Sequence, residues 1–146
     1  MCALAAGANH LVVDREGKFA SEVLALTGGV GVQAVFDGSG AEGFTDSLAV
    51  VDYHGTLALY GPLFDAPMPS LSVWDLPRSI KLTYPVVLDH CRTRERLVSN
   101  ATRLFDWVRA GDLKVTIGRR YALSEAAQAH RDIESRRTTG KLLLLP

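Results

Sequence analysis

Two glycine clusters are the residues whose type and spacing could bind a phosphate. Gly38, Gly40 and Gly43 have the GxGxxG spacing, follow an apolar run that ends at Asp37, and precede a segment with helical periodicity. A glycine turn between a strand and a helix aims backbone N–H groups at an anion. Residues 29–34 match GxGxxA, but they leave a helix and enter a strand, which is the wrong order. Residues 38–43 therefore have two interpretations, a tight turn near a ligand or a pyrophosphate site.

Asp37 directly precedes this turn. At the end of a strand it could accept a hydrogen bond from a ribose or cap the following helix. The carboxylate that dinucleotide sites place at the end of the next strand is absent, because Tyr60 and Gly61 stand there. The pyrophosphate interpretation therefore lacks one of its usual parts.

No catalytic constellation and no metal site is predicted. The four histidines share no metal-ligand spacing, and no serine stands in a GxSxG elbow. Cys2 and Cys91 are too far apart for a CxxC motif, so we interpret both as free thiols and expect a cytoplasmic protein.

Composition limits the possible partners. The chain has 146 residues, 47% of them hydrophobic, with 16 acidic and 16 basic side chains and no net charge. Such a chain is typical of one soluble globular domain, and it has no charge excess for binding nucleic acid. No apolar run approaches the roughly 20 residues that cross a bilayer, and no export signal is visible. We therefore expect neither a nucleic-acid nor a membrane partner.

Hydrophobic periodicity predicts an α/β fold. Strands are predicted at residues 10–13, 32–37, 56–60, 80–84, 113–117 and 141–145. Residues 2–7 are interpreted as the end of a helix. Further helices are predicted at 18–27, in a segment with Phe44, Leu48 and Val51 on one face, at 93–110, and after a Ser124 cap. His54 and Gly55 predict a turn, and the proline-rich segment 61–77 predicts a long loop at the carboxyl end of a strand. Such a loop is a candidate ligand site.

Several strings carry a resemblance when they are taken together. They are LTGGVGV (26–32), FDGSG (36–40), GTLALYG (55–61), LFDWV (104–108), GRRY (118–121) and AHRDIE (129–134) with TGK (139–141). In this order they resemble the carboxyl-terminal part of zinc-free quinone oxidoreductases, the zeta-crystallin-like branch of the medium-chain dehydrogenase/reductases. The resemblance covers nearly the whole chain.

This resemblance implies a truncated Rossmann-like fold. A doubly wound parallel sheet would lack its first βαβ unit and carry a carboxyl-terminal helix-strand-helix-strand extension. Residues 1–92 would form part of the nucleotide-binding domain, and residues 93–146 would return to the catalytic domain. The implied function is NAD(P)H-dependent reduction of a quinone or enone without zinc. Because the glycine fingerprint precedes the matched part, binding of NADP or NAD would be weak or absent. The alternative is a non-catalytic remnant or interaction module.

The resemblance also places individual residues near a cofactor. Asp37, Gly38, Ser39 and Gly40 would form a turn beside it. Tyr60 and Gly61 would follow its nicotinamide half, and the backbone of Thr83 and Tyr84 would meet its carboxamide. Asp14 would disfavour the adenosine 2′-phosphate and Arg136 would favour it, which leaves NADP and NAD both open.

A homo-oligomer is the last expectation. The strand from Ile80 to Tyr84 matches the edge at which the family joins two sheets, and an unpaired edge carries free N–H and C=O groups. The alternative is a monomer in which the terminal segment folds back over an exposed edge.

Overall fold

The structure is a computed structural model that describes residues 2–14, 18–61, 70–135 and 137–146. The chain divides into two compact units, an amino-terminal unit (Ala3–Asp89) and a carboxyl-terminal unit (His90–Pro146). Each unit contains its own parallel sheet.

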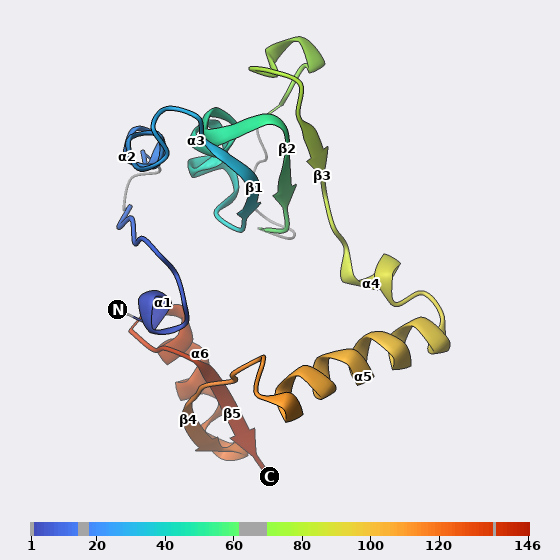
Figure 1. Cartoon of the computed structure of the whole chain (residues 1–146). Coiled ribbons are helices and arrows are strands. Elements are labelled where there is room, and N and C mark those ends of the chain that lie inside the picture. Colours follow the sequence, from blue (N-terminus) through green and yellow to red (C-terminus); the bar gives the residue numbers. More distant parts are fainter. Residues whose placement is uncertain (1, 15–17, 62–69, 136) are drawn as a thin grey trace. The chain divides into compact units, whose positions relative to one another are not determined.

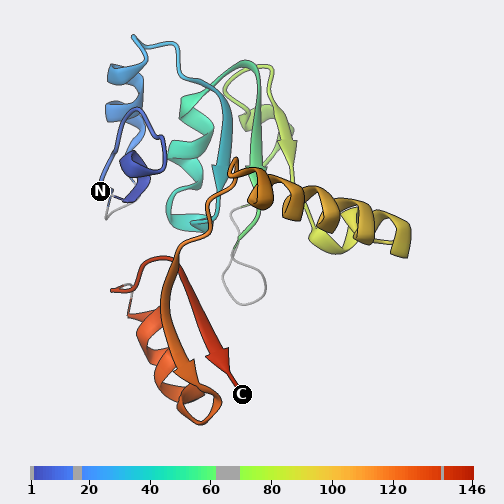
Figure 2. The ribbon, with the colours of Figure 1, turned by 60° about the horizontal axis from the view of Figure 1, so that its bottom comes forward.

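The amino-terminal unit alternates helices and strands (Figure 1). Its elements are α1 (Cys2–Ala5), α2 (Ala20–Leu26), β1 (Val32–Asp37), a 3₁₀ turn (Gly40–Glu42), α3 (Phe44–Val50), β2 (Val51–Leu59), a second 3₁₀ turn (Val73–Asp75), β3 (Lys81–Thr83) and α4 (Val87–His90). The strand order is β1-β2-β3, and both strand pairs are parallel. Helix α3 packs beside β1 and β2, as Figure 2 also shows. The predicted α/β fold with parallel strands is confirmed.

The core of this unit lies between α3 and the central strand β2. It consists of Phe44, Leu48, Val51, Leu57 and Leu59. Phe44 and Leu48 lie on α3, so their spacing of four had identified the buried side of the helix. Val51, predicted on the same helix face, is instead the first residue of β2, because α3 ends at Val50 and Val51 pairs with Val32. Val35, Leu71, Leu76 and Ile80 pack against this cluster. This cluster packs α3 against β1 and β2, close to the turn that connects β1 to α3.

The turn predicted at His54 and Gly55 lies inside β2 as an irregularity of the strand. Val32 pairs with Val51, but the next pair is Ala34 with Thr56, so β2 contains extra residues here. His54 takes a φ of 60°, a left-handed value that is uncommon for a residue other than glycine. The local pattern identified the bend, and pairing with β1 decided that the strand continues through it.

The strand predicted at residues 10–13 is wrong. These residues are irregular, and Leu11 and Val13 are exposed. A strand needs a hydrogen-bonding neighbour along at least one edge, and within the described residues β1 pairs only with β2. An apolar burst by itself does not supply that neighbour.

The carboxyl-terminal unit begins with a long helix and ends in a strand-helix-strand motif. Its elements are α5 (Arg94–Ala110), β4 (Ile117–Ala122), a 3₁₀ turn (Leu123–Glu125), α6 (Ala126–Glu134) and β5 (Lys141–Leu145). Strands β4 and β5 are parallel, and α6 packs against both. The side chain of Thr93 accepts a hydrogen bond from the N–H of Arg96, and Gly111 ends α5 with a φ of 83°. Both ends of the predicted helix are confirmed.

Two predicted details of this unit are wrong. The strand predicted at 113–117 begins only at Ile117, because pairing with β5 starts at Ile117 and runs to Ala122. The apolar residues of 113–117 placed the predicted strand too near the amino terminus, whereas the hydrogen-bonded strand includes two arginines. Ser124 lies within the 3₁₀ turn and does not cap α6, and the N–H of Ala122 donates to the carboxylate of Glu125 at 2.9 Å.

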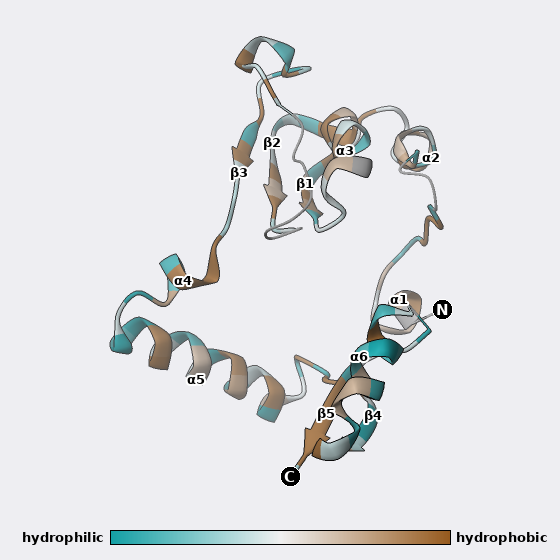
Figure 3. Cartoon of the chain, turned by 180° about the vertical axis from the view of Figure 1, so that it is seen from behind, coloured by the Kyte–Doolittle hydropathy of each residue, from teal (hydrophilic) through white to brown (hydrophobic). Residues whose placement is uncertain are grey.

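Helix α5 is amphipathic but has no buried residue in the structure. Figure 3 shows hydrophobic and hydrophilic segments alternating along it, while β5 is hydrophobic. None of the described helices combines the length and the apolar character that crossing a membrane requires.

Candidate functional site

Six of the residues predicted to lie beside a cofactor meet at the carboxyl ends of β1 and β2. Asp37 and Leu59 are the last paired residues of the two parallel strands, and the N–H of Tyr60 donates to the carbonyl of Asp37 at 2.9 Å. The other four are Gly38, Ser39, Gly40 and Gly61, which continue the chain from the two strand ends. In open α/β sheets, ligands bind at this edge.

The Asp37 carboxylate holds the turn that follows β1. Its Oδ1 atom accepts hydrogen bonds from the N–H of Ser39 at 2.7 Å and from the hydroxyl of Ser39 at 2.6 Å, and its Oδ2 atom accepts one from the hydroxyl of Ser47 at 2.8 Å. Asp37 is only 5% exposed, and burial by itself would raise the pKa of this carboxyl. The bonds from Ser39, Ser47 and Gly40 outweigh burial, so the pKa of Asp37 lies below its ordinary value. The carboxylate is therefore charged at neutral pH and is fully engaged within the protein.

The glycines of this turn allow unusually close approach. A Cβ atom on Gly38 would lie 2.9 Å from the ring of Tyr60, and one on Gly61 would lie 3.0 Å from the carbonyl oxygen of Gly38. Gly40 takes a φ of 74°, which favours glycine. The ring of Tyr60 therefore lies over the backbone of Gly38, with about half of its surface exposed. Gly38 and Ser39 are exposed beside this ring, whereas Gly40 is buried.

Thr83 and Tyr84 end the third strand at the same edge of the sheet. Thr83 is the last paired residue of β3 and stands opposite Ala58 of β2. Tyr84 follows it with an exposed side chain. Because all three strands are parallel, their carboxyl ends lie on one side.

Of the two residues implied near the adenosine phosphate, the structure describes only Asp14. Asp14 lies in the irregular segment before α2, where its carboxylate accepts a hydrogen bond from the N–H of Lys18 at 3.1 Å. Arg136 and residues 62–69 of the proline-rich segment 61–77 lie outside the described residues. NADP and NAD therefore both remain open as the cofactor.

Ser47 belongs to this site, although the sequence interpretation did not name it. It lies on α3, is 1% exposed, and donates to Asp37. One signal was present, because Ser47 follows Phe44 by three residues and so lies on the apolar face of the helix. A serine on a buried helix face needs a polar partner, and the aspartate at the preceding strand end was available.

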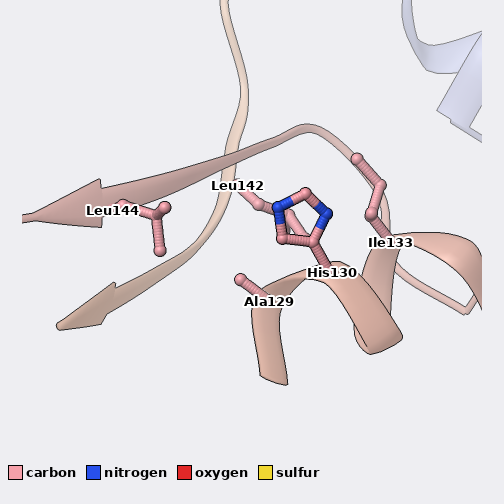
Figure 4. Close-up of a pocket in the computed structure, with 5 residues that line it drawn as sticks. All are labelled: Ala129, His130, Ile133, Leu142 and Leu144. Atoms are coloured by element: carbon pink, nitrogen blue, oxygen red, sulfur yellow. The ribbon is translucent and has the colours of Figure 1, made fainter. Parts of the chain in front are cut away.

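An apolar pocket of about 150 Å³ lies in the carboxyl-terminal unit between α6 and β5 (Figure 4). Its lining residues are Ala129, His130, Ile133, Leu142 and Leu144. The imidazole of His130 is the polar group of this lining. Such a lining suits an apolar side chain better than a phosphate or a ribose.

A polar cluster ties α6 to β4 in the same unit. The buried Tyr121 donates its hydroxyl hydrogen to Asp132 at 2.6 Å, and Arg119 donates to the same carboxylate at 3.2 Å while lying over the tyrosine ring. The bond from Tyr121 lowers the pKa of Asp132, and the same bond raises the pKa of Tyr121. Every member of this cluster is occupied with another, so its role is to hold the strand-helix-strand motif together.

Among the described residues of this sheet edge, hydroxyl groups are carried by Ser39, Tyr60, Thr83 and Tyr84. The buried carboxylate of Asp37 accepts three hydrogen bonds, two from Ser39 and one from Ser47. Within the part of the chain that the structure describes, no group of three or more His, Cys, Asp or Glu could hold a metal ion.

Comparison with protein-family models finds one match. The family model described as "Zinc-binding dehydrogenase" matches residues 6–144. Among curated proteins, a quinone oxidoreductase of Pseudomonas aeruginosa is 35% identical over 129 residues, which are 87% of this chain and 39% of that protein. A 2-haloacrylate reductase of a Burkholderia species is 32% identical over 142 residues, 96% of this chain and 43% of that protein.

Solved structures give the same picture. The mycobacterial protein Rv1454c in complex with NADPH is 40% identical with a TM-score of 0.85, and the match covers 99% of this chain and 46% of that one. Escherichia coli quinone oxidoreductase in complex with NADPH is 30% identical with a TM-score of 0.87, over 99% and 45% of the two chains. The chain spans less than half the length of each of these relatives.

Proposed function

The chain belongs to the zinc-binding dehydrogenase family, and on that premise we propose that it is the carboxyl-terminal part of an NADPH-dependent quinone or enone oxidoreductase. In this proposal residues 1–92 contribute to the nucleotide-binding domain, and residues 93–146 return to a catalytic domain outside this chain. We also propose that the protein is cytoplasmic, where its two cysteines would stay as free thiols.

The observation that carries this function is the convergence of three strand ends on one sheet edge. Gly38 and Ser39 are exposed, Tyr60 presents a half-exposed aromatic ring beside them, and Thr83 ends the neighbouring strand. These groups suit the nicotinamide half of a dinucleotide, which needs a flat surface and backbone hydrogen-bonding groups. The bound cofactor would supply the hydride, and the residues of this chain would orient it.

NADPH is the preferred cofactor in this proposal because two of the similar structures hold NADPH. Asp14 remains the residue that argues for NADH, since a carboxylate near the adenosine ribose would repel a 2′-phosphate. The family description also implies zinc. The described residues of this chain offer no ligand cluster for it, so no step is assigned to a metal.

We expect NADPH at millimolar concentration to shift the amide NMR signals of Gly38, Ser39, Gly40 and Tyr60 in this chain. The affinity should be weak, because these residues would contact only the nicotinamide half of the cofactor. A titration with NADH in parallel measures the preference between the two cofactors. Oxidation of NADPH by 1,4-benzoquinone is followed in the same samples.

The alternative function is a module that keeps the fold without the cofactor. Absence of turnover together with unchanged amide signals at millimolar NADPH would favour that alternative. Shifts confined to the carboxyl-terminal unit would also contradict the proposed site, because none of its strand ends is part of it.

A second proposal concerns self-association through the edge strand β3. In the described chain β3 pairs only with β2, and the exposed Val87 and Leu88 follow it closely. We expect sedimentation equilibrium at micromolar concentration to give a mass above the 15.8 kDa of one chain. Val86→Lys should lower that mass by placing a charge beside the edge. Val73→Lys, at an exposed position outside β3, is the matched control and should leave it unchanged.

A wild-type mass near 15.8 kDa would exclude this assembly. If both lysine variants keep the same mass above that of one chain, the chains associate through a surface other than β3.

A further inference from the structure

A buried serine of α3 is linked through one carboxylate to the turn of the proposed site. Ser47 donates to Oδ2 of Asp37, and Oδ1 of the same carboxylate accepts both the N–H and the hydroxyl of Ser39. The three hydrogen bonds span a helix, a strand end and a glycine turn. A carboxylate held at both oxygens cannot rotate without breaking one side of this link.

Burial gives this link its strength. Ser47 is 1% exposed and Asp37 is 5% exposed, so water cannot replace a lost partner on the helix side. Ser39 is exposed and lies at the turn itself. Its hydroxyl also lies so close to Gly43 that a Cβ atom there would collide with it. The orientation of the carboxylate is therefore set from the helix, and the orientation of Ser39 is set from the carboxylate.

We propose that Ser47 is a positioning residue of the cofactor site, acting through Asp37 on Ser39 and on the backbone between Gly38 and Gly40. Ser47 touches no ligand. It keeps the Asp37 carboxylate turned so that Ser39 stays bonded and the exposed residues Gly38 and Ser39 keep their position at the sheet edge. This inference rests on the proposed binding of NADPH at that edge.

The test begins without any ligand, on the full chain. Ser47→Ala should raise the pKa of Asp37 in a carboxyl NMR titration, because the charged form loses a hydrogen bond. It should also shift the amide signals of Ser39 and Gly40. Ser47→Cys fills nearly the same space with a weak donor and should behave like Ser47→Ala, which separates the hydrogen bond from packing. Thr45→Ala removes a hydroxyl from an exposed position of the same helix and should change none of these signals.

The second arm uses NADPH. We expect Ser47→Ala to weaken NADPH binding by about tenfold, the order of one lost hydrogen bond to a charged group. In an Asp37→Asn background the same substitution should have a much smaller effect, because the link is already altered. An equal loss of affinity in both backgrounds would overturn the proposal.

The two arms fail differently. If wild-type chain shows no NADPH-dependent shift, the cofactor site is contradicted, and the positioning of the turn by Ser47 is still decided by the ligand-free arm. If Ser47→Ala leaves the Asp37 titration and the Ser39 amide unchanged, the link does not position the turn, whether or not NADPH binds.

Discussion

Replacing Leu57 by alanine is expected to destabilise the amino-terminal unit by about 2–5 kcal/mol. Leu57 is fully buried at 0% exposure, stands in the middle strand of the sheet, and belongs to the core beneath α3. Truncation removes buried apolar contacts and leaves a cavity that the strands on both sides prevent from closing. The loss is comparable with the whole stability of many small domains, which is about 5–15 kcal/mol.

Leu82→Ala is the matched control for this substitution. Leu82 pairs with Leu57 in register on the neighbouring strand but is 43% exposed. The same atoms are removed from the same sheet, so the difference between the two variants reports burial. Urea unfolding followed by the amide NMR signals of β2 measures both changes. Equal losses in the two variants would contradict the position of the core.

Replacing Gly118 by alanine is expected to separate β4 from β5. A Cβ atom on Gly118 would collide with the backbone carbonyl of Thr139. The carbonyl of Thr139 cannot move aside as a flexible side chain could, because the backbone next to it is hydrogen-bonded. The N–H of Lys141 donates to the carbonyl of Thr116 at 2.8 Å. Since the parallel pair and α6 form one small motif, loss of this start of the ladder should release the whole motif.

Amide hydrogen exchange of Leu142 and Leu144 in β5 measures this release, and we expect their protection to be lost. Gly111→Ala is the control, because Gly111 has a φ of 83° with open space around its Cβ position. That substitution carries only the cost of a left-handed backbone, about 1–2 kcal/mol. Retained protection in Gly118→Ala would show that the two strands can part slightly without separating.

Elements whose signals lie within a few neighbouring residues could be predicted from the sequence. Helix α5 has a threonine cap, an apolar stripe and a glycine end, and all three act within one or two turns of the helix. The buried face of α3 was visible for the same reason, since a helix places residues three and four apart on one side. The order of these elements, with helices between parallel strands, also predicted the fold class.

Strand limits could not be predicted because they depend on partners that are distant in the sequence. Residues 10–13 have the composition of a strand without a neighbour among the described residues, whereas Ile117–Ala122 becomes a strand through Lys141–Leu145 despite its two arginines. Pairing also decided that β2 continues through His54, where the local signal was a turn.

The sequence by itself placed Asp37 at the end of a strand, and the family resemblance that it carries implied Asp37, Tyr60 and Thr83 beside one cofactor. Only the tertiary structure decided how Asp37 is used. Its two oxygens could have faced a ribose or capped a helix, and the fold turned one of them toward Ser47 of α3 and the other toward Ser39. The physical reason is that a hydrogen bond depends on distances below about 3.2 Å and on direction, which no spacing along the chain specifies.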